Sequence, residues 1–122
     1  MRGAIAMMMG SRLMPLAVQA TPATVNGGSE EPSPGPVVVS SDYTTVVVVS
    51  GPSNATYAYS WAWVSGTGGT ETITVTDPAS ATTAFSLLMN GDTYTTSIWR
   101  CTVTNNLGQA ATADVVVNLS RA

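Results

Sequence analysis

The feature that most constrains the fold is a regular succession of short β-rich segments from residue 37 onward. Segments rich in valine, threonine and aromatic residues alternate with turns built from glycine, proline, aspartate and asparagine. We expect strands at about 36–40, 44–51, 56–66, 70–78, 81–88, 95–104 and 111–120. About seven short strands at this spacing predict an all-β sandwich.

Alternation along these strands predicts which side chains are buried, because successive residues of a strand point to opposite faces. In segment 95–104, Trp99, Cys101 and Val103 share the apolar face, which we expect to point inward. In segment 56–66 one face carries four aromatic rings, those of Tyr57, Tyr59, Trp61 and Trp63.

The aromatic row of segment 56–66 has two interpretations. Burying a large apolar side chain contributes about 1.5–3 kcal/mol, so we expect the rings to face the core. The opposite face, with Ala58, Ser60, Ala62 and Val64, is then a flat strip of small residues. The alternative is a platform of exposed rings that stacks against a sugar or another ligand.

Composition excludes several classes of partner and chemistry. Only 9% of the 122 residues are charged, and the net charge is -3. The four cations, Arg2, Arg12, Arg100 and Arg121, lie too far apart in the chain to neutralise a row of phosphates, so we expect no nucleic-acid partner. Cys101 is the single cysteine, so no disulfide can form within the chain.

The sequence contains no recognisable reaction centre. It has no histidine, which excludes a Ser-His-Asp triad and histidine metal ligands. Cys101 is expected inside a strand, where a thiol is inert, and the acidic residues lack the spacing of a calcium loop. We therefore predict a protein that is not an enzyme and has no cofactor and no metal.

Composition divides the chain into three regions. Residues 1–20 are apolar, residues 21–36 are rich in proline, glycine and serine, and residues 37–122 form the predicted β domain. We interpret 21–36 as an extended linker. Arg12 interrupts the first region, and a membrane span needs about 20 unbroken apolar residues, so we expect no membrane partner.

The apolar region at 1–20 is interpreted as an extended arm that becomes ordered by binding a groove on another subunit. A terminus without fixed structure and a cleaved export leader are the alternatives. The side chains expected to make the contact lie near helical spacing or belong to the methionine cluster; they are Ile5, Met8, Met9, Leu13, Met14 and Leu16.

Three parts of the sequence together resemble an immunoglobulin-like domain: Val48, Trp61 and the segment WRCTVTNNLGQAATADVVV at 99–117. The resemblance implies a core tryptophan packed beside an aromatic-x-Cys strand. Two positions depart from the family pattern, since Val48 stands where a partner cysteine is usual and Trp99 replaces the corner tyrosine.

Within that family, the segments WAWVSG, TTAFS and RCTVTNNLGQAATADVVV are similar to immunoglobulin-like domains of tailed-bacteriophage structural proteins and of some bacterial surface proteins. The resemblance covers about residues 37–119 and implies a virion component, most concretely a capsid decoration protein assembled in the host cytoplasm. Its partners would be capsid or tail subunits and copies of itself. The alternative is a module that binds carbohydrate or a host receptor, with weak contact to host-surface glycans.

Overall fold

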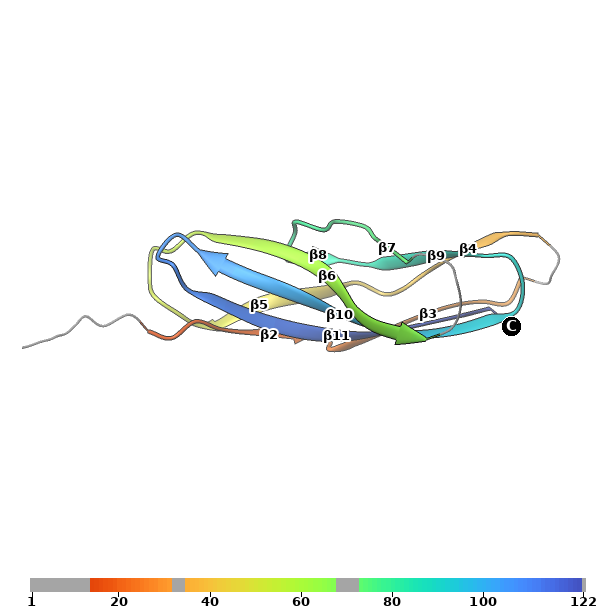
Figure 1. Cartoon of the computed structure of the whole chain (residues 1–122), viewed down its shortest axis with the longest axis horizontal. Coiled ribbons are helices and arrows are strands. Elements are labelled where there is room, and N and C mark those ends of the chain that lie inside the picture. The colour runs from red at the N-terminus through yellow and green to blue at the C-terminus, as the bar shows by residue number, and fades with distance from the viewer. Residues whose placement is uncertain (1–13, 32–34, 68–72, 122) are drawn as a thin grey trace, which may run out of the picture.

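The computed structural model describes residues 14–31, 35–67 and 73–121, and in these residues it contains strands and turns but no helix. The strands form an elongated, sandwich-like fold (Figure 1), so the all-β prediction is confirmed. Their bounds are β2 Ala17–Thr21, β3 Thr24–Ser29, β4 Val37–Ser40, β5 Thr44–Ser50, β6 Tyr57–Thr67, β7 Thr74–Val75, β8 Thr82–Thr83, β9 Phe85–Met89, β10 Thr93–Asn105 and β11 Ala110–Arg121.

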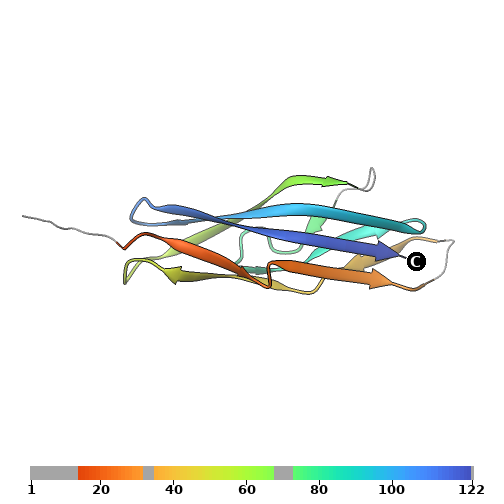
Figure 2. The same ribbon diagram turned by 90° about the horizontal axis from the view of Figure 1, so that it is seen from below.

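One layer is a four-stranded sheet with the order β3, β11, β10, β6. Strands β10 and β11 form a long antiparallel hairpin, and β6 pairs antiparallel with β10 at one edge. At the other edge β3 runs parallel to β11, and Figure 2 shows these two strands side by side. The hairpin is therefore the centre of this layer.

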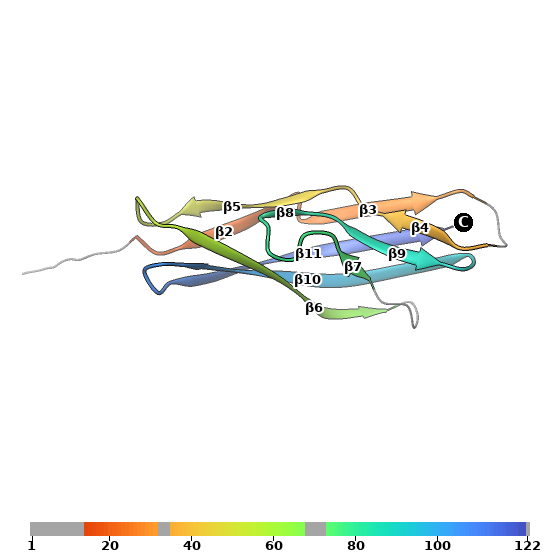
Figure 3. The same cartoon turned by 90° about the horizontal axis from the view of Figure 1, so that it is seen from above.

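The other layer consists of two three-stranded sheets, β2-β5-β8 and β4-β9-β7, which follow one another along the molecule (Figure 3). A bend at Ser41 joins them. The backbone N of Ser41 donates to the carbonyl of Phe85 at 2.8 Å, and the backbone N of Phe85 donates to Ser41 Oγ at 3.0 Å. Because the hydroxyl of Ser41 takes the place of a backbone acceptor, the amide of Phe85 stays satisfied where the strands change direction.

The N-terminal strands correct the predicted division of residues 1–36 into an arm and a linker. β2 pairs with β5 in one layer, and β3 pairs with β11 in the other, so residues 17–29 belong to the sandwich. The chain changes layer at the cis peptide bond Thr21–Pro22. Composition misled here in part because Gly27 allows a close approach of two strands: a Cβ on it would lie 2.1 Å from the carbonyl O of Ser40.

The remaining strand predictions differ from the structure in detail. The segments expected at 44–51, 56–66, 95–104 and 111–120 correspond to β5, β6, β10 and β11 within three residues at either end. The segment at 81–88 divides into β8 and β9, because β8 pairs with β5 and β9 pairs with β4 and β7. In the described part of segment 70–78, only Thr74–Val75 forms a strand.

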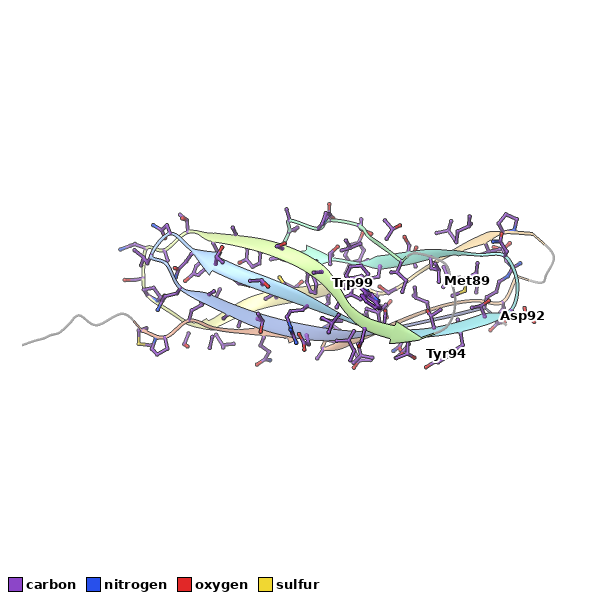
Figure 4. All side chains as sticks on the ribbon, viewed as in Figure 1. Met89, Asp92, Tyr94 and Trp99 are labelled. Carbon is purple, nitrogen blue, oxygen red and sulfur yellow. The ribbon has the colours of Figure 1, made fainter. Side chains whose placement is uncertain are left out.

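The core lies between the layers and is built around three aromatic rings. The ring of Phe85 packs edge-on against Trp61, with centroids 5.7 Å apart, and at a tilt against Trp99, 5.2 Å apart. Trp99, Cys101 and Val103 all point inward, as alternation predicted, and Figure 4 places Trp99 in the middle of the molecule. The aliphatic part of the core includes Val25, Val39, Val46, Leu87, Met89, Val115, Val117 and Leu119.

Arg121 connects three backbone segments at the end of the molecule where the C-terminal residues lie. Its side chain is buried and donates to the backbone carbonyls of Glu31 at 3.1 Å, of Gly35 at 2.5 Å and of Met89 at 2.8 Å. Charge-assisted hydrogen bonds of this kind are stronger than neutral ones. The last residue of β11 thereby holds the end of β3, the start of β4 and the end of β9 in one place.

Candidate interaction site

The described part of the predicted arm lies at the end of the molecule opposite the C-terminus (Figure 1). Ile5, Met8, Met9 and Leu13 lie outside the described residues. Met14 is exposed, and its carbonyl accepts a hydrogen bond from Gln109 Nε2 at 2.9 Å. Leu16 packs against the core of its own domain, so its side chain is already engaged.

The turn between β10 and β11 positions Gln109 for this contact. Asn105 Oδ1 accepts from the backbone N atoms of Leu107 and Gln109, both at 3.0 Å, and Gly108 takes a φ of 84° that favours glycine. Asn105 Nδ2 also donates to Gln109 Oε1 at 2.8 Å, which fixes the amide of Gln109. A rigid turn therefore holds the backbone at Met14.

The aromatic row of β6 is divided between the core and the surface. Trp61 is buried at 6% exposure, and Tyr57 and Tyr59 are half-buried against the core. Trp63 is 58% exposed, so the expectation that all four rings face the core is wrong for this residue. On the opposite face, Ala58, Ser60 and Ala62 are exposed, and Val64 is exposed at the end of this row.

A register shift between β6 and β10 directly follows Trp63. Pairing between β6 and β10 is irregular at Ile98/Trp99, where Trp63 faces Trp99 and Ser65 faces Ile98, so Val64 is extra. Such a bulge bends the strand and redirects its side chains. A Cβ on Gly66 would lie 2.9 Å from Ser97 Cβ and 3.1 Å from Trp63 Nε1, so the glycine makes room for the indole.

The outer face of the four-stranded sheet carries polar groups that bond to one another. Arg100 Nε and Nη2 donate to the two carboxylate oxygens of Asp114 at 2.7 and 3.0 Å. These bonds lower the pKa of Asp114 and raise the pKa of Arg100. Farther along, Asn118 accepts from Thr96 Oγ1 at 2.9 Å and donates to Asn26 Oδ1 at 3.0 Å. These polar groups lie on three strands, and the partly exposed Ile98 and Val116 lie between them on the same face.

The other candidate reactive groups are the buried thiol of Cys101 and the acidic side chains. Burial raises the pKa of Cys101, and a backbone hydrogen bond at Ser60 opposes that rise. A thiol that is harder to ionise is a poorer nucleophile. Among residues 14–31, 35–67 and 73–121, no group of three or more metal-ligating side chains lies together.

Within these same residues, no helix has the length and apolar character needed to cross a membrane. No protein-family model, curated protein or solved structure matches the chain.

The sequence did not reveal the structural roles of two side chains, those of Arg121 and Gln109. Arg121 was grouped with the scattered cations, whereas its guanidinium is buried on backbone carbonyls. Gln109 was not singled out at all. The turn signal Asn-Asn-Leu-Gly at 105–108 located the turn, but no pattern in the sequence links it to Met14.

Proposed function

We propose that this chain is a non-enzymatic structural protein of a tailed-phage virion, specifically a capsid decoration protein with an immunoglobulin-like sandwich as its displayed part. In this proposal the segment before Met14, with Ile5, Met8, Met9 and Leu13, binds a groove on capsid or tail subunits. Flexible methionine side chains adapt to an irregular apolar groove. Many copies on one particle would add avidity to a modest individual affinity.

The observation that carries the proposal is the position of Met14. It lies at one end of an elongated molecule, beside the rigid turn at Asn105–Gly108, and the C-terminal residues lie at the other end (Figure 1). An apolar segment of 13 residues that precedes this point can engage a partner while the sandwich extends away from it. Attachment and display would then use opposite ends of the molecule.

The immunoglobulin-like assignment is supported by the packing around Cys101. Trp61 and Trp99, which carry the resemblance in sequence, both pack against Phe85 in the core. Val48 pairs with Val18 on β2, and Cys101 is a free buried thiol, in keeping with the missing disulfide.

Deletion of residues 1–13 tests the attachment proposal. The deletion must stop there, because Ala17–Thr21 is a strand of the sandwich and Leu16 packs on the core. We expect the shortened chain to keep its circular-dichroism spectrum and unfolding midpoint but to be lost from purified particles. A matched full-length variant with Ile5, Met8, Met9 and Leu13 all changed to serine should also be lost. Full occupancy by either chain would contradict the proposal.

A second candidate function is carbohydrate or host-receptor binding, and the exposure of Trp63 favours it. An exposed indole on an edge strand can stack on a sugar ring or a receptor side chain. Glycan-array binding that is lost in Trp63→Ala and kept in Leu107→Ala, another exposed apolar residue, would favour this function. Equal binding by the two variants, or binding by neither, would favour the structural role.

A further inference from the structure

The end of the molecule that holds the C-terminal residues carries three acidic side chains. Glu30 and Glu31 follow β3, Asp92 lies in the turn between β9 and β10, and all three are exposed. The segments that carry them meet because Arg121 donates to the carbonyls of both Glu31 and Met89. Three acidic side chains and this one buried guanidinium leave a net charge of -2 among the described residues of this end (Figure 4).

Two adjoining apolar side chains lie at the same end. Val38 is 63% exposed and Leu88 is 49% exposed, and they are direct partners in the β4–β9 ladder. β4 begins two residues after Gly35, whose carbonyl also accepts from Arg121, and β9 ends at Met89. We call this surface the acidic end, and its residues are Glu30, Glu31, Asp92, Val38 and Leu88.

The opposite end of the molecule has the complementary charge. Residues 14–17 and the β5–β6 and β10–β11 turns beside them carry no charged side chain (Figure 1). The segment 1–13 that leads into them carries Arg2 and Arg12, no acidic residue, and most of the apolar side chains of the predicted arm. A segment that is both basic and apolar matches a surface that is both acidic and apolar.

We propose that segment 1–13 of one chain binds the acidic end of a second copy, so that copies associate head to tail. The segment cannot bring Arg12 to the acidic end of its own chain. Arg12 is two residues from Met14, a reach of about 7 Å. Met14 lies beside the start of β11, whereas the acidic end lies beside its last residue, Arg121. These 12 residues span about 40 Å at about 3.3 Å per residue.

The contact joins two different surfaces, so it links copies into rows or rings rather than symmetric pairs. Exposed ion pairs are individually weak, so the apolar side chains supply most of the affinity and the charges select which surfaces meet. The inference does not rest on the proposed virion role. A chain whose segment is held by a shell subunit still presents its acidic end to a further copy.

The test is sedimentation velocity of the full chain over a range of protein concentrations. We expect the sedimentation coefficient to rise with concentration beyond the value of a dimer. The rise should be smaller at about 1 M salt, where the screening length is about 3 Å. Deletion of residues 1–13 should leave a monomer. A monomeric wild-type chain, or association that survives the deletion, would overturn the proposal.

Charge reversals distinguish head-to-tail binding from contact between two segments. The double variants Arg2→Glu with Arg12→Glu, and Glu30→Lys with Glu31→Lys, should each weaken association at least about fivefold, because like charges then meet in the contact. A mixture of the two should associate again, since opposite charges meet once more. Asp77→Lys changes an exposed acid outside the acidic end and should behave as the wild type. Reversals without effect, or a mixture that stays monomeric, would exclude this contact.

A competition experiment covers the case in which a reversal variant unfolds. A synthetic peptide of residues 1–13, added in excess to the wild-type chain, should occupy the acidic end and lower the sedimentation coefficient toward that of the monomer. The same peptide with Arg2→Glu and Arg12→Glu should have a much smaller effect. If neither peptide dissociates the wild-type assembly, the acidic end does not bind the segment.

Discussion

Trp61 and Trp63 lie two residues apart on the same strand, yet one is 6% exposed and the other 58%. Trp61 packs against Phe85, its backbone N donates to Pro78 O at 3.0 Å, and its Nε1 donates to Ser80 O at 2.8 Å. Thus the loop between β7 and β8 covers the edge of β6 at this residue. Trp63 lies next to the bulge and outside the core cluster.

Alternation therefore determines on which face of a strand a side chain lies, but it does not determine whether that side chain is buried. A side chain on the inner face of an edge strand is buried only where the opposite layer or a loop reaches it. The loop at 77–81 reaches Trp61. Trp63, next to the bulge at Val64, is outside the core cluster and lies mostly at the surface.

The largest expected effect of a substitution on this strand is that of Trp61→Ala. Removing a buried tryptophan leaves a cavity beside Phe85 and an unsatisfied carbonyl at Ser80, so we expect a loss of about 3–5 kcal/mol in the free energy of unfolding. Equilibrium unfolding in urea measures it. A loss below about 1 kcal/mol would mean that Trp61 is not a core residue.

Gly66→Ala should have the next largest effect. The added methyl group would lie 2.9 Å from Ser97 Cβ, which cannot move away easily, so we expect a loss of about 1–3 kcal/mol in urea unfolding. The matched control is Gly28→Ala, where the nearest atom lies 3.5 Å away, and its stability should stay within about 1 kcal/mol of the wild type. Equal losses in both variants would refute the close packing at Gly66.

Trp63→Ala should change stability much less than Trp61→Ala. The indole is mostly in water in the folded chain, so we expect a loss below about 1 kcal/mol. The wild-type fluorescence emission should also lose its most red-shifted part in this variant. A loss comparable to that of Trp61→Ala would show that Trp63 packs in solution.

The smallest expected effect concerns the ion pair between Arg100 and Asp114 on the outer face of the sheet. Arg100 lies opposite Ala62 of β6, the residue between Trp61 and Trp63. The pKa of Asp114 is lowered by its hydrogen bond to Arg100. The pair's contribution is thus present above about pH 4, the ordinary value, and is lost as pH falls through the folded-state pKa.

Thermal melts between pH 6 and pH 2 measure this contribution. Asp114→Asn should lose slightly less stability on acidification than the wild type, because both partners are about half exposed and such pairs are weak. Asp92→Asn, in the turn before β10, is the control and leaves the pair intact (Figure 4). If Asp114→Asn lost more stability on acidification than the wild type, the predicted direction of the effect would be wrong.

Much of the fold could be predicted from the sequence because its central strands have clear alternation. Trp99, Cys101 and Val103 were assigned inward from period alone, and the structure agrees. β2 and β3 were missed because they are short and follow no clear alternation, and because Gly27 and Gly28 are typical of linkers. Their burial depends on pairing with β5 and β11, which lie far away in the sequence.

The surfaces were harder to predict than the core. The register shift beside the exposed Trp63 involves β10 as well as β6, and a register shift is a property of two strands together. The role of Arg121 depends on three carbonyls from three segments. In the predicted arm, composition marks residues 1–20 as apolar, but Leu16 packs on its own domain.

The division of the aromatic row can be measured directly by fluorine NMR of the chain labelled with 5-fluorotryptophan. The three tryptophans give three resonances, which single Trp→Phe variants assign. We expect the Trp63 resonance to shift when H₂O is replaced by D₂O, and the Trp61 and Trp99 resonances to stay nearly unchanged. A solvent shift at Trp61 as large as that at Trp63 would contradict the account.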